Sequence, residues 1–355
     1  MKKVVISIVS IAAILFVSGC SKAPNEPATL KSIKTTQKIL VDAVAGKAWA
    51  AAPAMQVKLS KLPYKPSNGY TGIKGTVVIL KSLYDDNNVY FLMQYDDPTK
   101  SFARFPWVKQ KDGSWKQSMA KDSTGHDNTY YEDKMAFLWN INSTGFEKKG
   151  CAASCHMSVD GLVDGIEDSS AGRKFTLPGE TIDIWHWKSV RTGPVNQIDD
   201  QFMNSDRAEQ SKTWGRHGDT KTGGGYVNNI NEAGNAPAFM NPQMTEENKY
   251  FVLKDSKVPF VDTFKAGQII PGIIVSAFEG PRADISAKGK WADGKWTIEW
   301  KRARVTTGEN SRTQDVQFDD LAKVYFFGVA VFDNSQINHL YHEKPLRMVF
   351  KKAAQ

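Results

Sequence analysis

Cysteine is scarce in this sequence. The 355 residues contain three cysteines, Cys20, Cys151 and Cys155, and the last two are close neighbours. A chain of this length can bury a hydrophobic core without disulfide bonds, so the low count is compatible with a globular domain. It excludes a disulfide-rich scaffold, and Cys151 and Cys155 therefore need a local explanation.

Long hydrophobic runs are missing beyond the first residues. After a short basic start, the apolar run from Val4 to Val17 is too short to span a membrane and has the length of a secretory signal core. It ends in Val17-Ser-Gly-Cys20, which resembles the cleavage box of bacterial lipoproteins. We expect residues 1–19 to be a lipoprotein signal peptide and Cys20 to carry the lipid; an ordinary cleaved signal is the alternative. Ser21, in place of an aspartate, favours the outer membrane where the host has two membranes.

Neither sign of charge is in large excess. The formal net charge is +8, and removal of the signal, with its two lysines and no acidic residue, lowers it to +6. The lysines are scattered, and no arginine-rich helix or nucleic-acid motif is present. These features indicate a solvated surface, so nucleic acid is not an expected partner.

The segment Cys151-Ala-Ala-Ser-Cys155-His156 is the most specific motif of the chain. In c-type attachment, two cysteines form thioether bonds with haem vinyl groups and the next histidine ligates the iron, usually with the spacing C-x-x-C-H. Here one additional residue separates the cysteines. We expect Cys151 and Cys155 to bind one covalent haem c and His156 to be its proximal iron ligand.

Two other uses of the cysteine pair remain as alternatives. A disulfide between Cys151 and Cys155 would close a very small loop and contribute little stability. Zinc could bind both thiols and His156, but no other histidine has the spacing of a zinc finger or ribbon relative to them.

Strand patterns dominate the chain. Residues 75–84 and 89–95 are rich in β-branched and aromatic residues and flank the turn cluster Asp85-Asp-Asn-Asn88, which predicts a hairpin. Further expected strands are residues 135–140, 182–188, 268–277, 295–304 and 323–332. The pattern predicts an all-β fold, mainly an antiparallel β-sandwich, with long loop insertions and few short helices.

Two segments differ from this pattern. We expect residues 20–45 to be a lipidated tether, since 22–27 is polar and contains proline, and 28–44 could form a short helix but lacks a strong apolar stripe. Residues 46–355 form the expected sandwich domain. Within it, 204–247 is rich in asparagine and glycine and predicts a long loop or lid, with residues 223–225 as a flexible turn.

Several stretches, taken in order, resemble the haem-binding domain family of the ethylbenzene dehydrogenase gamma subunit, in its c-type cytochrome branch. They are residues 89–98, 133–140, 150–156, 183–188, 294–302 and 329–333. The resemblance implies an antiparallel β-sandwich with one haem at an end of the sheets, electron transfer as the function, and a molybdenum oxidoreductase as a partner. In the better-known b-type members a methionine and a lysine ligate the iron, whereas this chain offers covalent attachment and His156.

The ligand opposite His156 has several candidates. The resemblance places the lysine ligand of b-type relatives near the C-terminus, where this chain has Asn338-His-Leu-Tyr-His342, so one loop offers two imidazoles. We favour His342, which is nearer the strand-like residues 346–350, and keep His339 as the alternative. Histidine at both axial positions would give a lower potential than ligation by histidine and methionine.

His186 is a weaker candidate, either as a ligand or as a contact to a haem propionate. Alternation along residues 182–188 puts Trp185 and Trp187 on one strand face and His186 and Lys188 on the other. The alternative interpretation of His186 is an ordinary packed or surface histidine.

Other side chains could contact the haem, but the sequence gives less support for them. Met157 and Met203 could ligate iron, although methionine more often fills a core. Cations that could pair with propionates are Arg173, Lys188 and Arg191. His126 and His217 lie in polar contexts and are expected to be exposed.

These features predict a lipid-anchored, extracytoplasmic monohaem c-type cytochrome that transfers single electrons between redox proteins, such as other cytochromes or a molybdenum oxidoreductase. In a Gram-negative host it would face the periplasm from the outer membrane. Hydrolase, zinc-protease and nucleotide-binding motifs are missing, which favours an electron-transfer protein or subunit over a stand-alone enzyme. The alternatives are a haem enzyme or sensor with an open distal site, and a non-redox sugar-binding lipoprotein that uses Trp107, Trp115 and Trp214.

Overall fold

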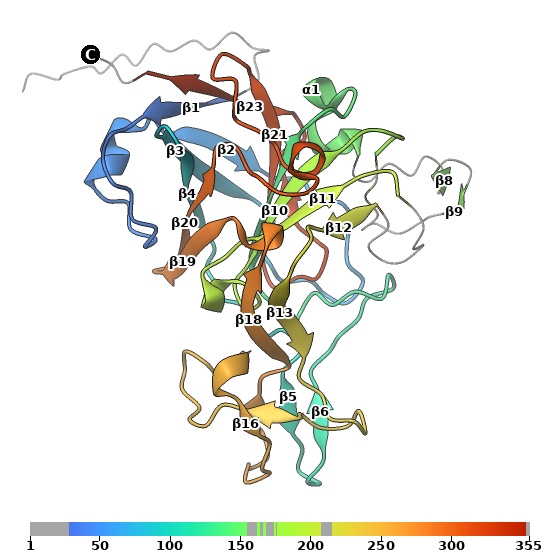
Figure 1. Ribbon diagram of the computed structural model, residues 1–355. Helices are drawn as coiled ribbons and strands as arrows, with labels where there is room; N and C mark the ends of the chain where they lie inside the picture. Colours follow the sequence, from blue (N-terminus) through green and yellow to red (C-terminus); the bar gives the residue numbers. More distant parts are fainter. Residues whose placement is uncertain are drawn as a thin grey trace, which may run out of the picture.

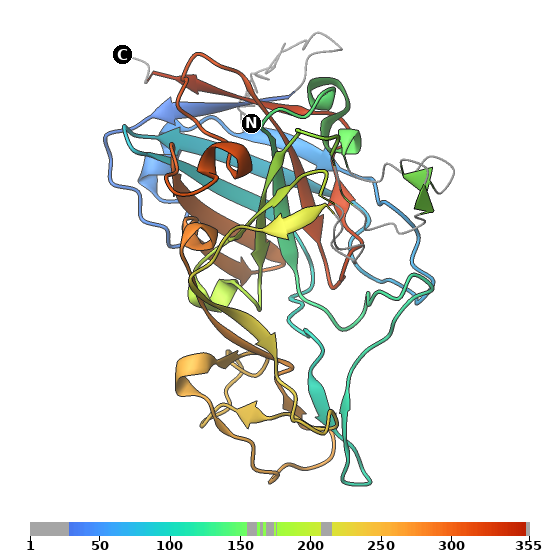
Figure 2. The same cartoon turned by 45° about the vertical axis from the view of Figure 1, so that its right-hand side comes forward.

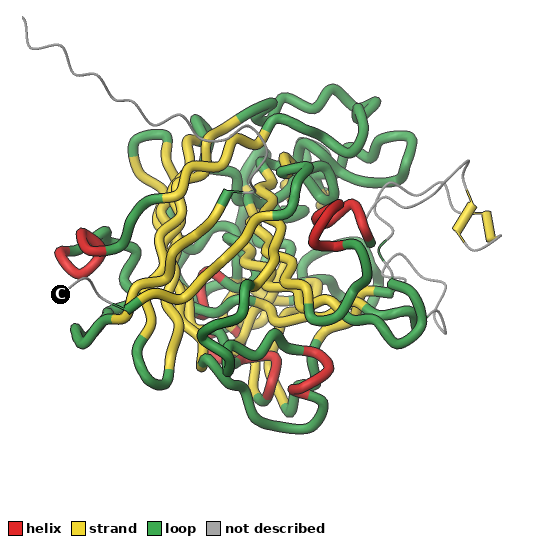
Figure 3. Tube along the Cα trace, turned by 90° about the horizontal axis from the view of Figure 1, so that it is seen from above, coloured by secondary structure: helices red, strands yellow, loops and turns green. Residues whose placement is uncertain are grey.

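Two β-sheet layers packed face to face form the body of the protein (Figure 1). The computed structural model describes residues 28–154, 162–163, 166–167, 174, 176–206 and 215–352. Viewed from above, strands cross the centre of the molecule, and loops and short helices surround them (Figure 3). The predicted all-β sandwich with few short helices is confirmed.

The first layer is antiparallel throughout. Its strands, in spatial order, are β12 (Arg216–Gly218), β11 (Asp199–Met203), β10 (Ile182–Lys188), β7 (Lys134–Asn140) and β21 (Tyr325–Phe332). The short β22 (Leu340–Tyr341) also pairs with β21. This layer carries the candidate site on its outer face.

The second layer continues from the first through a short pairing between β21 and β23 over Tyr325, Phe326 and Phe327. Its strands are β23 (Leu346–Lys351), β1 (Thr29–Lys34), β3 (Thr76–Tyr84), β4 (Asn88–Asp96), β20 (Lys295–Ala303) and β19 (Ser286–Ala292), with β2 (Met55–Leu59) also paired to β3. β1 runs parallel to both β23 and β3, and the other pairs are antiparallel.

Aromatic side chains fill the space between the layers. The ring of Phe91 on β4 lies 5.2 Å from that of Trp300 on β20, 5.6 Å from Trp185 on β10 and 5.8 Å from Trp139 on β7. All four side chains are buried. Rings at these separations add stability beyond the area they bury. Alternation along the strands turns the neighbouring residues of β7 and β10 to the outer face.

A lobe of small sheets extends below the sandwich (Figures 1 and 2). Its sheets are β13 (Gly223–Asn228) with β18 (Ile273–Glu279) and β15 (Val252–Leu253); β14 (Phe239–Met240) with β16 (Val258–Pro259); and β17 (Ile269–Ile270) with β5 (Trp107–Lys109) and β6 (Trp115–Gln117). The remaining short elements are η1 (Lys47–Ala51), α1 (Phe146–Lys149), η2 (Gly150–Ala153), β8 (Leu162–Val163), β9 (Ile166–Glu167), η3 (Gly193–Val195), η4 (Lys254–Ser256), η5 (Pro281–Ala283) and α2 (Ser311–Gln314).

Two local expectations were wrong. Residues 29–34, expected within the tether and as part of a short helix, form β1 between two strands of the second layer, because this position pairs them on both sides. Residues 223–225, expected as a flexible turn, begin β13. There a side chain on Gly224 would collide with the Ala277 carbonyl, so close backbone approach to β18 explains the glycine.

The segment 204–247 is only partly a loop, since its described residues include β12, β13 and β14. Within the part of the chain that the structure describes, no helix has the length and apolar character needed to cross a membrane.

Candidate functional site

The outer face of the first layer changes from apolar to cationic along its strands. Strand register sets three rows across β10, β7 and β21, which are Ile184–Leu138–Gly328, His186–Ala136–Ala330 and Lys188–Lys134–Phe332. The first row is apolar, the second joins an imidazole to two small residues, and the third carries two ammonium groups. We call these three rows the site face.

Cys151 lies at the apolar end of the site face. It belongs to η2, which packs on β21 directly after α1. A Cβ atom placed on Gly328 would lie 3.3 Å from the Cβ of Cys151, so the absence of a side chain on Gly328 lets the cysteine sit close to the strand.

Two adjoining cavities cover the site face. The larger, of about 280 Å³, lies toward Lys134 and Lys188, and the smaller, of about 30 Å³, is lined by Cys151 and His339. The residues that line both are Ala136, Leu138, Lys174 and Phe332. The hollow therefore follows the polarity of the site face from the cysteine to the cations.

Positive charge dominates the larger cavity. Among its described lining residues no carboxylate is present, and the cationic ones are Arg104, Lys134, Lys174, Lys188, Arg191 and Arg216. Burial lowers the pKa of Lys134 well below its ordinary value, and Arg191 lowers it further. Such a lining favours an anionic group in the cavity.

Two acids that do not line the cavity compensate part of this charge. Glu132 forms an ion pair with Arg191 and accepts hydrogen bonds from the Val190 and Arg191 amides. Asp199 forms ion pairs with Lys188 and, at 2.6 Å, with Nε of Arg282. Burial alone would raise the pKa of Asp199, but Lys188 and Arg282 hold it well below its usual range. The ion pairs therefore fix where these cations lie.

His186 presents a buried imidazole in the middle of the site face. The residue is 5% exposed, and its Nε2 has no hydrogen-bond partner among the described residues. Burial lowers its pKa well below the ordinary value, and Lys188 and Lys134 lower it further, so the ring is neutral near pH 7. Its ring stacks on Phe332 at 5.6 Å. A neutral imidazole of this kind can bind a metal or a hydrogen-bond donor.

His339 lies in the small cavity with Cys151. The residue is 7% exposed, its ring is 4.7 Å from that of Phe332, and its Nδ1 is 2.7 Å from the Ile337 carbonyl oxygen. Because a carbonyl only accepts hydrogen bonds, Nδ1 carries the proton, and Nε2 of the neutral ring holds the lone pair. Metal-binding histidines are commonly oriented in this way.

His342 has a different position from His339. It is partly exposed, its Nδ1 is 2.7 Å from the Lys344 carbonyl oxygen, and it lines neither cavity. The backbone of Lys344 and Pro345 lies against Gly150, just before Cys151.

The structure thus gathers Cys151, His186, His339, Lys188 and Arg191 on one face. Met203 is fully buried in the apolar cluster that includes Cys151. Other predicted residues lie outside the described part of the chain, namely Cys20, Cys155, His156, Met157, Arg173 and Trp214. Trp107 is buried and donates a hydrogen bond to the Asn229 carbonyl, which removes it from any sugar-binding surface.

The expectation that His126 and His217 are exposed was wrong. His126 is buried and lines the larger cavity, because the loop before β7 folds over the site face. His217 is partly buried and its ring packs on that of Phe202 at 5.3 Å. Arg104, Lys134 and Arg216 were not predicted from the sequence. Alternation along β7 puts Lys134 on the same face as Ala136, but its partners depend on strand register, which a single strand does not reveal.

In a comparison with protein families, a family model described as ethylbenzene dehydrogenase matches residues 46–344. A comparison with curated protein sequences gives no match. Among solved structures, the chain is similar to a carbohydrate-binding module of family 9 from Caldicellulosiruptor kristjanssonii in complex with cellotriose, with 8% identity, 92% of this chain and 95% of that chain covered, and a TM-score of 0.35. It is also similar to a putative carbohydrate-binding protein from Bacteroides uniformis, with 6% identity, coverages of 92% and 100%, and a TM-score of 0.34.

We expect Asp199→Asn to lower the free energy of unfolding by about 3–5 kcal/mol, because it leaves Lys188 and Arg282 without their buried carboxylate. Urea unfolding followed by circular dichroism measures this change. The matched control is Asp96→Asn, which breaks an ion pair with Lys295 whose side chains are 74% and 42% exposed. The control should change stability by about 1 kcal/mol or less. Equal effects of the two substitutions would contradict the role given to Asp199.

Proposed function

The chain belongs to the ethylbenzene dehydrogenase family, and we propose that it is a monohaem c-type cytochrome that transfers single electrons between redox proteins. The observation that carries this proposal is the polarity of the site face, which runs from Cys151 and Gly328 at one end to Lys134 and Lys188 at the other. Haem has the same polarity, since its vinyl groups and its propionates lie on opposite edges.

The residues present fit a covalently bound haem. Cys151 stands at the apolar end, where a vinyl-bearing edge would lie, and Cys155 and His156 follow it in the attachment motif. Ala136 and Ala330 in the middle row and Gly328 in the apolar row have a small side chain or none, which leaves room for a flat group. The cations of the larger cavity would pair with the two propionates.

We propose His156 and His339 as the axial ligands. The sequence favoured His342 over His339, but His339 is the one that shares a cavity with Cys151 and has a tautomer suited to metal binding through Nε2. His186 is the second candidate, because its buried Nε2 lacks a partner among the described residues. Ligation by two histidines would favour the ferric state relative to ligation by histidine and methionine.

Haem would supply the one-electron chemistry, and the protein would set its environment. Lys134, Lys188, Arg191 and Arg216 would hold the propionates, and the aromatic core beneath the site face would exclude water from one side. Positive charge close to the iron would raise the reduction potential, whereas a second histidine ligand in place of methionine would lower it.

The proposal extends to location and partners. We propose that Cys20 carries a lipid that anchors the mature protein outside the cytoplasm, on the periplasmic face of the outer membrane in a Gram-negative host. Its redox partners would be other cytochromes or a molybdenum oxidoreductase, to which family membership points.

The first test is the spectrum of protein made with a cytochrome c maturation system. We expect haem that stays attached on a denaturing gel, and loss of this attachment in the Cys151→Ala, Cys155→Ala double variant. His339→Ala should convert low-spin haem to a form that binds carbon monoxide rapidly after reduction, whereas the matched control His342→Ala should not. If only His186→Ala produced the form that binds carbon monoxide, His186 and not His339 would be the second iron ligand. Absence of covalent haem from the unsubstituted protein would refute the proposed function.

The second test concerns the anchor. Cys20→Ser should move the protein from the membrane fraction to the soluble fraction, because it removes the only residue that we expect to be lipidated. Ser18→Ala keeps a small residue before the cysteine and should leave the protein in the membrane fraction. Immunoblots of the two fractions give the measurement, and membrane retention of Cys20→Ser would show that the anchor lies elsewhere.

A further inference from the structure

Five aspartates meet on the inner side of β10 and β11, opposite the site face. They come from two strands and from the segments after β12, η5 and α2, and are Asp183, Asp200, Asp219, Asp284 and Asp315. We call this group the acidic centre. Asp199 and Asp200 are adjacent in β11, and both are fully buried, but they point to opposite faces of the strand.

Three carboxylates of the acidic centre lie close together, and four of its five aspartates are buried. Single carboxylate oxygens of Asp183, Asp200 and Asp315 lie within 4.8 Å of one another. Asp183 and Asp200 are fully buried, and Asp219 and Asp315 nearly so. An ion bound at the 2.3–2.6 Å typical of calcium would hold oxygens roughly this far apart.

A second observation indicates that the centre holds a ligand. Each of the five carboxylates has one buried oxygen that no donor group of the described residues reaches, namely Oδ1 of Asp183, Asp219, Asp284 and Asp315 and Oδ2 of Asp200. The contacts of Asp219 with Asp315 and of Asp284 with Asp200 join one carboxyl group to another. Buried polar atoms are rarely left unpaired, and five in one place require an explanation.

Donors around the centre hold the other oxygens of these carboxylates. Oδ2 of Asp183 accepts hydrogen bonds from Trp185 Nε1 at 3.0 Å, Arg302 Nη1 at 3.0 Å and the Val316 amide at 2.9 Å. Oδ2 of Asp315 accepts one from the Thr306 hydroxyl. Donors that orient a carboxylate from outside, while its second oxygen points to a common centre, are typical of metal sites.

Charge leads to the same conclusion. Of the described cations, Arg302 is the one that hydrogen-bonds to the centre, and the nearby Arg282 is paired with Asp199. The carboxylates of the acidic centre therefore outnumber the cations that are bonded to them.

We propose that the acidic centre binds one calcium ion. The available donors are all carboxylate oxygens, which suit a hard cation, and the group has no histidine or cysteine that would favour zinc. Calcium takes six to eight oxygen ligands and tolerates irregular geometry, whereas magnesium demands a nearly ideal octahedron of ligands. The ion would fasten the segments after η5 and α2 to the edge formed by β10, β11 and β12.

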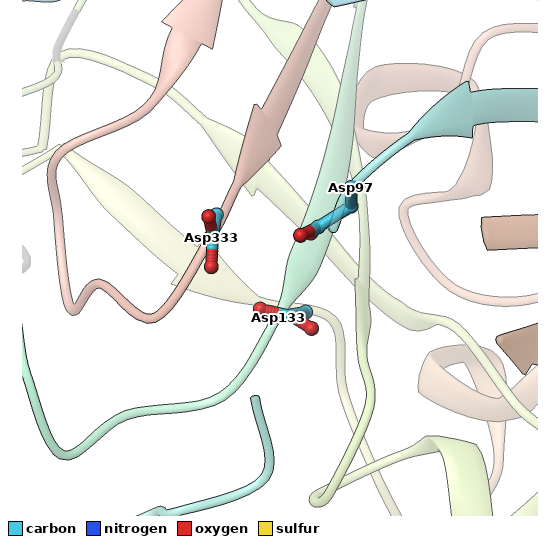
Figure 4. Close-up of side chains that lie close together, drawn as sticks. All are labelled: Asp97, Asp133 and Asp333. Carbon is cyan, nitrogen blue, oxygen red and sulfur yellow. The ribbon is translucent and has the colours of Figure 1, made fainter. Parts of the chain in front are cut away.

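A second acidic group provides the control. Asp97, Asp133 and Asp333 also lie close together and point toward one another (Figure 4). Their oxygens are mostly satisfied, for instance by the Ser101 amide at 2.8 Å and the Asn334 amide at 3.1 Å on Asp133, and by the Ile73 amide at 2.9 Å on Asp333. One oxygen, Oδ2 of Asp97, lacks a partner among the described residues. Protein donors thus reach five of the six carboxylate oxygens of this triad.

Direct binding is the decisive test. The full protein, stripped of metal on a chelating resin, is titrated with calcium chloride by isothermal titration calorimetry. We expect one ion per chain and an affinity about tenfold or more lower for Asp200→Asn, which keeps the shape of the side chain and removes a ligand charge. Asp333→Asn, in the triad of Figure 4, should bind calcium as the unsubstituted protein does.

The same variants separate binding from folding. Because Asp200→Asn removes one of several crowded negative charges, its melting temperature without metal should equal or exceed that of the unsubstituted protein. With calcium the order should reverse. The proposal is overturned by absence of binding to the unsubstituted protein, or by loss of binding in Asp333→Asn with retention in Asp200→Asn. These outcomes do not depend on haem, so they are independent of the proposed function.

Discussion

The alternation of side chains along β10 is the constraint on which the rest of the structure depends. Trp185 and Trp187 face the interior and pack in the aromatic core, whereas His186 and Lys188 face outward into the cavity. Asp183, on the inner side, belongs to the acidic centre. A shift of one residue in register would exchange these sets and place charged groups in the core. One strand therefore fixes the core, the site face and the acidic centre together.

The buried carboxylates on the two sides of β11 differ in how many of their oxygens are paired with cations or other donors. On the outer side Asp199 is fully paired, since Lys188, Arg282 and the side-chain Nε2 of Gln201 all donate to it. On the inner side Asp200 belongs to a group in which carboxylates outnumber the bonded cation. The cavity thus has a surplus of positive charge and the acidic centre a surplus of negative charge, although neighbouring residues of one strand build both. Each surplus is costly in a folded protein unless a ligand of opposite charge reduces it.

The sequence revealed local structure well and long-range contacts poorly. Period-two patterns identified β3, β4, β7, β10, β20 and β21, and for β10 they also identified the outward face. They did not reveal that Lys134 lies beside Lys188, that His126 folds over the cavity, or that Asp200 meets four other aspartates, because register and loop packing bring these together. β1 was missed for a similar reason: its few apolar residues become a strand only because partners flank it on both sides. The cysteine motif differs because its six adjacent residues predict haem attachment without long-range contacts, and this attachment stays a prediction.

The two proposed ligands are linked through β11 although they lie on opposite sides of it. A calcium ion at Asp200 would fix the backbone of β11, and with it the position of Asp199. Asp199 in turn holds Lys188 at the cationic end of the site face, where a propionate would lie. Loss of the ion would leave the attachment of haem through cysteine intact. Cys151 in η2 packs against Gly328 of β21, at the other end of the site face. Its effect would reach the haem through the charges around the propionates, and these charges help to set the reduction potential.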